Sequence, residues 1–417
     1  MGWNVIKCNR GNSFRDCSKA IAKAKKMEGP TIIIFKTTIG IGTDKEGTSA
    51  IHGVALSEEE LKVFNKKLGV FENFFVPNDV RDWCMASSRR GKLNHEKWNQ
   101  DLAVYATSNP ELYRQFVNFF DRKKVDFDKI ARSNYKLEGM SGREFNKTLL
   151  NEIASKLYQI VGGTADVMHS TCAFIEDGGN YNIGNRRGRN IHFGVREHAM
   201  AAICNGISLY EDFLPFCSTF LAFSNYMLPA IRMAALMKLN VLYIFTHDSI
   251  FVGEDGVTHQ PIEQLANLRS IIGLNVFRPC DSNELLAGYK LALEKSGPMA
   301  FVLSRQKMPV VDGSLKGAMN GGYILKSAKK EAQIVIYASG SEVSLALQVS
   351  DELSKKFDVS VVSIPCVEIF ENQSSAYKNK VLQKNAKIRV AIEASNDNVW
   401  YKFIGDDGLF VGIDDYQ

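Results

Sequence analysis

The sequence of 417 residues has few of the features that would place a protein in a membrane, on a nucleic acid or around a structural metal. It lacks an apolar run of membrane-spanning length, and its opening, MGWNVIKCNRGN, lacks the apolar core of a signal peptide. Lys and Arg total 51 against 46 for Asp and Glu, and these charges are interspersed along the chain. We therefore expect small anionic ligands, no nucleic acid and no membrane as partners.

The eight cysteines form no CxxC pair and follow no regular spacing. This pattern argues against structural zinc and against a disulfide framework, and it predicts a reducing, cytoplasmic location. With 45% hydrophobic and 23% charged residues, the composition is that of a soluble globular protein. The length allows two or three domains.

The first 140 residues are predicted to hold an incomplete domain and a connection. Within residues 1–60, a spacing like that of a capping box at Ser13 and Asp16 opens a helix, and residues 31–36 are typical of a buried strand. One helix and one or two strands cannot cover both faces of a sheet, so we interpret this segment as the remnant of an α/β domain. Residues 61–140 are charged and aromatic, and we expect a helical connection between domains.

Residues 141–310 show a regular alternation of buried, strand-like runs with helical segments. This alternation predicts the α/β class, with a doubly wound parallel sheet. Residues 311–330 are predicted to be a linker, and residues 331–417 a smaller α/β domain in which nothing catalytic stands out. The predicted strands of the larger sheet are at 159–165, 190–194, 240–246, 275–278 and 299–303.

Polar residues follow several of these predicted strands, namely Asp166, Glu197, His247 and Arg305. Ligands bind outside the carboxyl ends of parallel strands, so we expect these side chains to converge on one edge of the sheet. Glu197 lies among apolar neighbours, and a buried carboxylate needs a partner, a raised pKa or a function. The pattern alone favours a core helix in which unseen neighbours satisfy this carboxylate.

The segment HDSIFVGEDGVTHQP carries His247, Asp248, Glu254, Asp255 and His259 within thirteen residues. A metal could use the two histidines and a carboxylate, but a loop broken by glycines offers no fixed ligand spacing. An array of donors and acceptors for a polyhydroxylated substrate is the favoured interpretation.

Two arginines and three aromatic residues are further candidates. Arg143, in the first turn of a capped helix, and Arg305 are suited to hold a phosphate group. Phe220, Phe223 and Tyr226 recur at helical spacing, which is typical of a core and also fits a platform for a heterocycle.

Three long segments give the chain a resemblance to transketolase over essentially its whole length: FGVREHAMAAICNGIS, THDSIFVGEDGVTHQPIEQLANLRS and ASGSEVSLALQVSDEL. The resemblance implies the thiamine diphosphate-binding fold, with a pyrimidine-binding domain and a C-terminal domain. It also implies thiamine diphosphate and Mg²⁺ as cofactors, and sugar phosphates as substrates. The implied reaction transfers a two-carbon ketol unit from a ketose phosphate to an aldose phosphate in the pentose phosphate pathway.

Carried over residue by residue, the resemblance implies catalytic roles for Glu197 and His259. A partly buried carboxyl group at Glu197 that shares a proton with the aminopyrimidine ring would favour the reactive tautomer of the cofactor. His259 resembles the histidine that contacts the donor near its reacting carbonyl, and Phe223 the residue that stacks on the ring. The other implied cofactor contacts are Phe220, Tyr226, Asp166 and Ile39, and the other implied substrate contacts are His52, Arg143, Ser170, His247, Asp255 and Arg305.

The chain departs from the family pattern chiefly in the first domain. The Gly-Asp-Gly followed by paired asparagines that binds diphosphate and metal is absent, so no metal ligand is predicted. We expect a chain that lacks most of the diphosphate-binding domain and the extreme C-terminus. Phe251 replaces the usual glycine after HDSI, and Val257 replaces the usual proline.

These departures leave several hypotheses open. As an enzyme, the sequence would be a fragment of a complete transketolase, or the chain would act as a homodimer or pair with a chain that supplies the diphosphate-binding domain. Alternatively, it is a non-catalytic truncated subunit that binds or regulates a full-length partner, or an inert product of a misplaced start codon.

Overall fold

The computed structural model describes residues 2–70, 72, 74–119, 125–132, 139–210, 212–294, 296–309 and 311–416. The chain divides into two units, Met1–Ser108 and Asn109–Gln417, each of which is described by itself. None of the eight cysteines forms a disulfide. No helix in the described ranges has the length and apolar character needed to cross a membrane.

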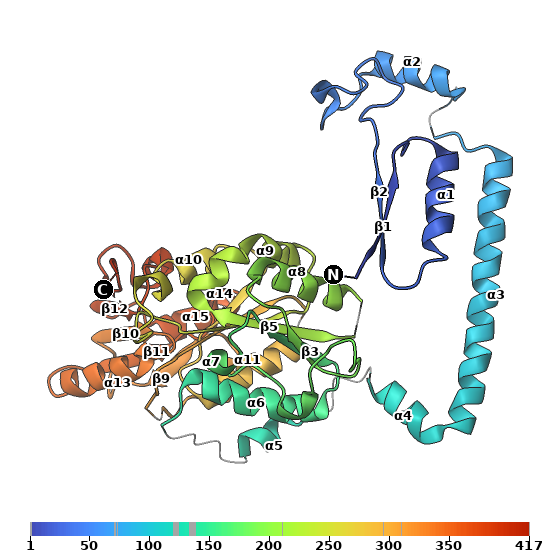
Figure 1. The fold of residues 1–417 in the computed structure, drawn as a ribbon. Helices are drawn as coiled ribbons and strands as arrows, with labels where there is room; N and C mark the ends of the chain where they lie inside the picture. The colour runs from blue at the N-terminus through green and yellow to red at the C-terminus, as the bar shows by residue number, and fades with distance from the viewer. Residues whose placement is uncertain are drawn as a thin grey trace. The chain divides into compact units, whose positions relative to one another are not determined.

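The first unit contains a two-stranded parallel sheet whose register runs from Asn4↔Thr31 to Cys8↔Phe35. The hydroxyl oxygen of Ser13 accepts a hydrogen bond from the Asp16 N–H at the start of the intervening helix, which confirms the predicted helix start. The elements labelled in Figure 1 are β1 (Asn4–Cys8), α1 (Phe14–Ala24), β2 (Thr31–Phe35), α2 (Glu58–Leu68) and α3 (Asn78–Ser108), and the short helix η1 (Ser49–Ile51) follows β2.

The second unit is built on a six-stranded sheet of order β4-β3-β5-β6-β8-β7, in which every pairing is parallel. The predicted doubly wound parallel sheet is therefore confirmed. Its strands are β3 (Ile160–Thr164), β4 (Asn190–His192), β5 (Leu214–Phe220), β6 (Leu242–Thr246), β7 (Asn275–Phe277) and β8 (Met299–Leu303).

Strand β5 was not predicted, although it is central and buried along its whole length. Its sequence, LPFCSTF, contains a proline and three small polar or thiol side chains, and this composition is more typical of a turn than of a central strand. Pro215 is tolerated because β5 pairs with β6 only from Phe216 onward, so the missing N–H lies near the start of the strand.

Helices cover both faces of this sheet. On one face, α5, α6 and α11 share a core with β5, β6 and β8, and on the other face α8, α9 and α10 pack against the same strands. Figure 1 shows α6 on one side of the sheet and α8 and α9 on the opposite side. The helices are α4 (Pro110–Phe119), α5 (Phe127–Arg132), α6 (Gly142–Lys156), α7 (Met168–Thr171), α8 (Glu197–Leu209), α9 (Leu228–Leu236), α10 (Gln264–Arg269) and α11 (Ser282–Glu294).

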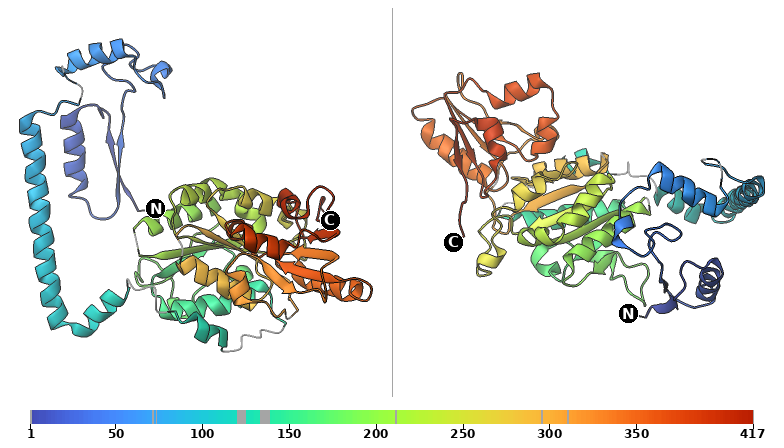
Figure 2. Two further views of the ribbon diagram at one scale, coloured as in Figure 1. Left: turned by 180° about the vertical axis from the view of Figure 1, so that it is seen from behind. Right: turned by 90° about the horizontal axis from the view of Figure 1, so that it is seen from above.

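The C-terminal part of this unit is a five-stranded sheet of order β13-β12-β10-β11-β9, seen as the orange to red lobe in the right panel of Figure 2. Strand β9 is antiparallel and lies in the segment 311–330. The domain boundaries stay predictions. The elements are α12 (Leu315–Ala318), β9 (Tyr323–Lys326), β10 (Ile334–Ala338), α13 (Glu342–Leu353), β11 (Val359–Ser363), α14 (Val367–Glu371), α15 (Ser375–Leu382), β12 (Ile388–Ile392), α16 (Tyr401–Ile404) and β13 (Leu409–Val411).

Candidate active site

The candidate site lies at the carboxyl edge of the six-stranded sheet. Because all its strands are parallel, the residues that follow them share one edge. Asp166 follows β3 and Glu197 follows β4. His247 comes directly after β6, and Arg305 lies two residues beyond the end of β8. The short helix η4 (Leu221–Tyr226), which carries Phe223 and Tyr226, follows β5.

His247 is the most constrained of these residues. Its φ of 59° lies in the left-handed region, which is unusual for a residue with a side chain, and the residue is only 3% exposed. Its ring lies 3.9 Å from the Phe220 ring, centroid to centroid, and its Nδ1 is 2.9 Å from Oγ1 of Thr246. A buried residue keeps a strained backbone conformation only when its neighbours hold it, so the surroundings of His247 fix its position.

Four ionisable groups surround this imidazole. Burial is the main cause that lowers the pKa of His247 to about 4, and the cations of Arg143 and Arg305 lower it further, as does His259. Asp255 acts in the opposite direction. His247 is therefore neutral at pH 7, and four of the other predicted substrate contacts, Arg143, Asp255, His259 and Arg305, lie near enough to influence its charge.

Arg143 is held by hydrogen bonds from its backbone and its guanidinium group, and part of the guanidinium group is still able to donate. Its N–H donates to the Ser304 carbonyl oxygen over 3.2 Å, and its Nη1 donates to the Ser170 carbonyl oxygen over 2.6 Å. Its Nε is buried and has no hydrogen-bond partner among the described residues. Arg143 and Ser170 are thus together, and the guanidinium keeps a donor for an anion.

The aromatic residues form a connected cluster. The rings of Phe220 and Phe223 lie 5.9 Å apart at 21°, and Phe223 meets His259 edge-on at 5.1 Å. Tyr226 continues the row at 6.2 Å from Phe223. Beside them lies a cavity of about 490 Å³ whose walls include Phe223, Tyr226, Thr258, Gln260 and Glu263. An aromatic wall of this kind suits a flat heterocycle.

Glu197 is placed by a tight connection between β4 and α8. Gly194 has a φ of 69°, and a Cβ there would lie 2.2 Å from Nη1 of Arg196, which donates to the Phe193 carbonyl oxygen over 3.0 Å. Helix α8 begins at Glu197, so its half-buried carboxyl group lies in the first turn, where the helix dipole stabilises an anion.

Glu197 and three further predicted contacts, Asp166, Ile39 and His52, are not joined to this cluster by any described bond. Asp166 is exposed and has a φ of 65° after β3. Ile39 and His52 lie in the first unit, where both are exposed. The roles of all the predicted site residues stay predictions.

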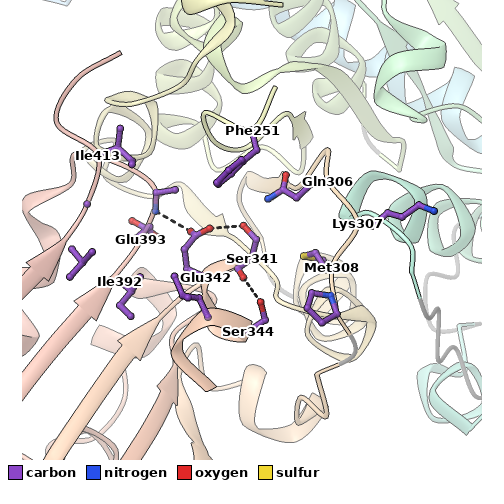
Figure 3. A pocket seen from close by; sticks show the side chains of 15 residues that line it. Phe251, Gln306, Lys307, Met308, Ser341, Glu342, Ser344, Ile392, Glu393 and Ile413 are labelled. Atoms are coloured by element: carbon purple, nitrogen blue, oxygen red, sulfur yellow. Dashed lines mark hydrogen bonds between the residues drawn. The ribbon is translucent and has the colours of Figure 1, made fainter. Parts of the chain in front are cut away.

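A second cavity, of about 380 Å³, lies at the carboxyl ends of β10, β12 and β13 (Figure 3). Phe251 and Met308 form one side, and Glu342 lies on the other. Oε1 of Glu342 accepts from the Ser341 hydroxyl over 2.6 Å, and Oε2 accepts from the Ala394 N–H over 3.0 Å. This carboxylate is therefore already paired inside the protein.

Arg278 was not predicted from the sequence. It is a fully buried cation that follows β7 and donates a hydrogen bond to Asp248, the residue after His247. Its only local signal is a charge placed directly after an apolar strand. Among the residues that the structure describes, no group of three or more His, Cys, Asp or Glu could hold a metal ion.

Three family models match the chain in succession. They describe the transketolase thiamine diphosphate binding domain at residues 1–124, the transketolase pyrimidine binding domain at 138–311 and the transketolase-like C-terminal domain at 321–416. The chain belongs to the transketolase family. The resemblance identified from the sequence is thereby confirmed, and the thiamine diphosphate-binding fold with it.

Individual transketolases match along the whole of this chain. The one from Halalkalibacterium halodurans is 41% identical over 99% of this chain and 64% of its own length. The structure of the Leishmania mexicana transketolase covers 100% of this chain and 62% of its own, with a TM-score of 0.92 and 34% identity. A Pichia stipitis transketolase solved in complex with sedoheptulose-7-phosphate gives a TM-score of 0.90 and 32% identity, covering 100% of this chain and 63% of its own. The chain thus spans a little under two thirds of the length of these relatives.

Proposed function

We propose that the chain provides the pyrimidine-binding half of a transketolase site and transfers a two-carbon ketol unit from a ketose phosphate to an aldose phosphate. The observation that carries this proposal is the set of cationic and neutral donors around His247 at the carboxyl edge of the sheet. The complex of the Pichia stipitis relative with sedoheptulose-7-phosphate supports sugar phosphates as ligands. We place this reaction in the pentose phosphate pathway and in the cytoplasm.

In this proposal Arg143 and Arg305 hold the phosphate group of the sugar. A guanidinium group matches the geometry of a phosphate, and the buried Nε of Arg143, which has no hydrogen-bond partner among the described residues, gains one when an anion binds. His247 is neutral and therefore acts as a hydrogen-bonding group beside the phosphate. Asp255 and His259 have oxygen and nitrogen atoms suited to sugar hydroxyl groups.

The residues present fit the ring end of thiamine diphosphate. Phe220, Phe223 and Tyr226 would hold the pyrimidine ring against the cavity wall, and Glu197 would hold a proton at a ring nitrogen. When bound, the cofactor supplies a nucleophilic carbon that takes up the two-carbon unit and returns it to the acceptor.

Mg²⁺ and a partner chain complete the proposal. The diphosphate group of the cofactor requires cationic neutralisation, and Mg²⁺ prefers carboxylate and carbonyl oxygen ligands. We propose that a second chain, either another copy or one with a full diphosphate-binding domain, supplies these ligands. Asp166 and Ile39 remain predicted cofactor contacts, and His52 remains a predicted substrate contact.

A ketol-transfer assay tests this function. The purified chain is mixed with a ketopentose phosphate, an aldopentose phosphate, Mg²⁺ and thiamine diphosphate, with and without a relative that carries the Gly-Asp-Gly motif but has its own counterpart of Glu197 replaced by alanine. Glu197→Ala should lower kcat by about 100-fold or more, because proton handling is worth that much. The control is Glu352→Ala, which removes an exposed carboxylate of α13. Turnover that persists in Glu197→Ala, or no turnover of the wild-type chain in either mixture, would contradict the proposal.

A further inference from the structure

His247 has a strained backbone conformation, and its own side chain makes few interactions that could hold this conformation in place. Its side chain has a single hydrogen-bonding neighbour in the described part of the chain, Thr246, which precedes it. A φ of 59° is disfavoured for a residue with a Cβ, so the backbone relaxes unless a neighbouring residue is fixed. The anchor is found one residue further on.

Asp248 is held by one cation. It is 2% exposed, and its Oδ2 accepts hydrogen bonds from both Nε and Nη2 of Arg278, over 3.1 and 2.7 Å. Its Oδ1 has no hydrogen-bond partner in the described ranges. Burial raises the pKa of Asp248, and the charge of Arg278 opposes that rise. The position of Asp248 therefore depends on Arg278.

Arg278 is fixed in turn by the C-terminal sheet. Its side chain is fully buried, and its Nη1 donates to the Ser339 carbonyl oxygen over 3.0 Å and to Oε2 of Glu342. Its backbone carbonyl oxygen accepts from the Gly340 N–H over 3.0 Å. Gly340 has a φ of 57°, and a Cβ there would lie 2.7 Å from Cγ of Arg278, so this close approach requires glycine.

We propose that Arg278 is a positioning residue that uses the C-terminal sheet to hold Asp248, and through it His247, in the sugar-phosphate site. The C-terminal sheet thereby gains a part in catalysis without contributing a catalytic residue. The inference rests on the proposed function for the role of His247 towards substrate.

Arg269 provides a matched control within the same group of carboxylates. It too is buried, and it donates to both oxygens of Glu393, over 2.8 and 3.0 Å, and to Oδ2 of Asp397 over 2.7 Å. Glu393 also lies 3.8 Å from Arg278, so the two arginines share a neighbour. Of the two, Arg278 alone has a described bond to Asp248. Replacing either one by lysine keeps the charge and removes the paired hydrogen bonds of the guanidinium.

The test follows the imidazole of His247 directly. The full chain contains seven histidines, so ¹⁵N-histidine labelling gives few signals, and His247→Asn assigns the relevant one. In the wild type this ring should titrate at about 4. In Arg278→Lys we expect the pKa of His247 to rise by about one pH unit or more, because a loosened loop exposes the ring to water. In Arg269→Lys it should stay at about 4.

Asp248→Asn is the second variant, in case Arg278→Lys fails to fold. It retains the bonds of Arg278 to Ser339 and Glu342, and the same rise is expected. The main charges that shift the pKa of His247 are Arg143 and Arg305 together with Asp255 and His259, so neither variant removes one of them. A rise therefore reports movement of the loop.

Two results would overturn the inference. One is a His247 pKa that stays at about 4 in both Arg278→Lys and Asp248→Asn. The other is an equal rise in Arg269→Lys, which would indicate general loosening of the contact between the sheets. In the ketol-transfer assay, we expect Arg278→Lys to raise KM for the phosphorylated donor by about tenfold, more than it lowers kcat. The titration requires no turnover, so failure of the proposed function would leave the test of Arg278 valid.

Discussion

The two units of the chain bury their apolar side chains to very different degrees. In the second unit, every residue of strands β5, β6 and β8 is buried. In the first unit, the buried apolar residues among those described are Ile6, Cys8 and Ala20, and the 31 residues of α3 include no buried one. Similar α/β sequences thus give a core in one region and an open surface in the other.

The difference follows from the number of layers. The large sheet has helices on both faces, whereas in the described part of the first unit the buried core of the β1-β2 pair includes residues of one helix, α1. Ile32 and Ile34 of β2 and Trp83 and Trp98 of α3 therefore remain exposed, Trp83 to 72%. An apolar surface of this kind is typical of a contact with another protein, which agrees with the proposed pairing of chains.

The largest expected effect is a core substitution in the second unit. Phe216→Ala, in β5, removes a ring that is 0% exposed, and we expect it to lower the free energy of unfolding by about 3–5 kcal/mol. Ile34→Ala, in β2, removes a side chain of a residue that is 49% exposed and should cost less than about 1 kcal/mol. Amide hydrogen exchange, read peptide by peptide, measures both changes.

The matched pair also tests the comparison of the two units. Loss of protection in Phe216→Ala should spread over β5 and its neighbours β3 and β6. An Ile34→Ala chain that loses as much protection as Phe216→Ala would show that the first unit has a core of its own, and the contrast in burial would have no energetic meaning.

Buried strands can be predicted from the sequence where burial produces a continuous apolar run, and they are missed where it does not. Strands β6 and β8, LYIFT and MAFVL, are recognisable because both faces of a parallel sheet are covered. Strand β5 is equally buried, but Ser218 satisfies its hydroxyl group with the Ile244 carbonyl oxygen over 2.6 Å, a contact that no local pattern reveals. Polar residues satisfied across strands therefore hide a central strand from single-sequence reasoning.

An intermediate effect concerns pH and the buried histidine of the second unit. The pKa of His247 falls from 6.5 in the unfolded chain to about 4 in the fold, so between these values the unfolded chain binds more protons. Stability therefore rises with pH over this window and is lost as the pH falls below 6.5. Between pH 7 and pH 5 this residue should cost about 1–2 kcal/mol of unfolding free energy.

His247→Asn should remove that part of the pH dependence, and asparagine also tolerates the left-handed backbone. Denaturant unfolding at pH 7 and pH 5 gives the comparison with the wild type. If both chains lose the same stability, the ring is not held in its neutral form by burial. The exposed His52 of the first unit provides the control, since His52→Asn should leave the wild-type pH dependence intact.

The candidate residues of the site came from local signals, whereas their support did not. Residue type and the ends of β6 and β8 led to His247 and Arg305, and the capped start of α6 led to Arg143; the roles of all three stay predictions. Neither the left-handed backbone at His247 nor the hydrogen bonds from Arg278 to Asp248 could be predicted from the sequence. Arg278 is bonded to partners 30 and 64 residues away in the sequence, and nothing local indicates which carboxylates meet it.

The smallest expected effect is at the starts of two helices, α2 and α6, which share the sequence pattern Ser-x-x-Glu. In α2, the Ser57 N–H donates to Oε2 of Glu60 over 2.8 Å, and in α6 the N–H and hydroxyl of Ser141 both donate to Oε2 of Glu144 over 2.8 Å. Ser57 is exposed in the first unit, whereas Ser141 is 1% exposed in the second. In Ser141→Ala, Oε2 of Glu144 keeps the Ser141 N–H but loses the hydroxyl donor, and water replaces a lost donor less readily at a buried position, so burial should decide the cost.

We therefore expect Ser141→Ala to lower the free energy of unfolding by about 1–2 kcal/mol, and Ser57→Ala to lower it by less. The Ser141 backbone N–H, followed by its hydroxyl, holds the pKa of Glu144 below its usual range despite some burial. In Ser141→Ala that pKa should rise, which ¹³C carboxyl titration would detect. Equal costs for the two variants would mean that the capping geometry, which both helices share, matters more than burial. The contrast between the units would then be confined to their apolar side chains.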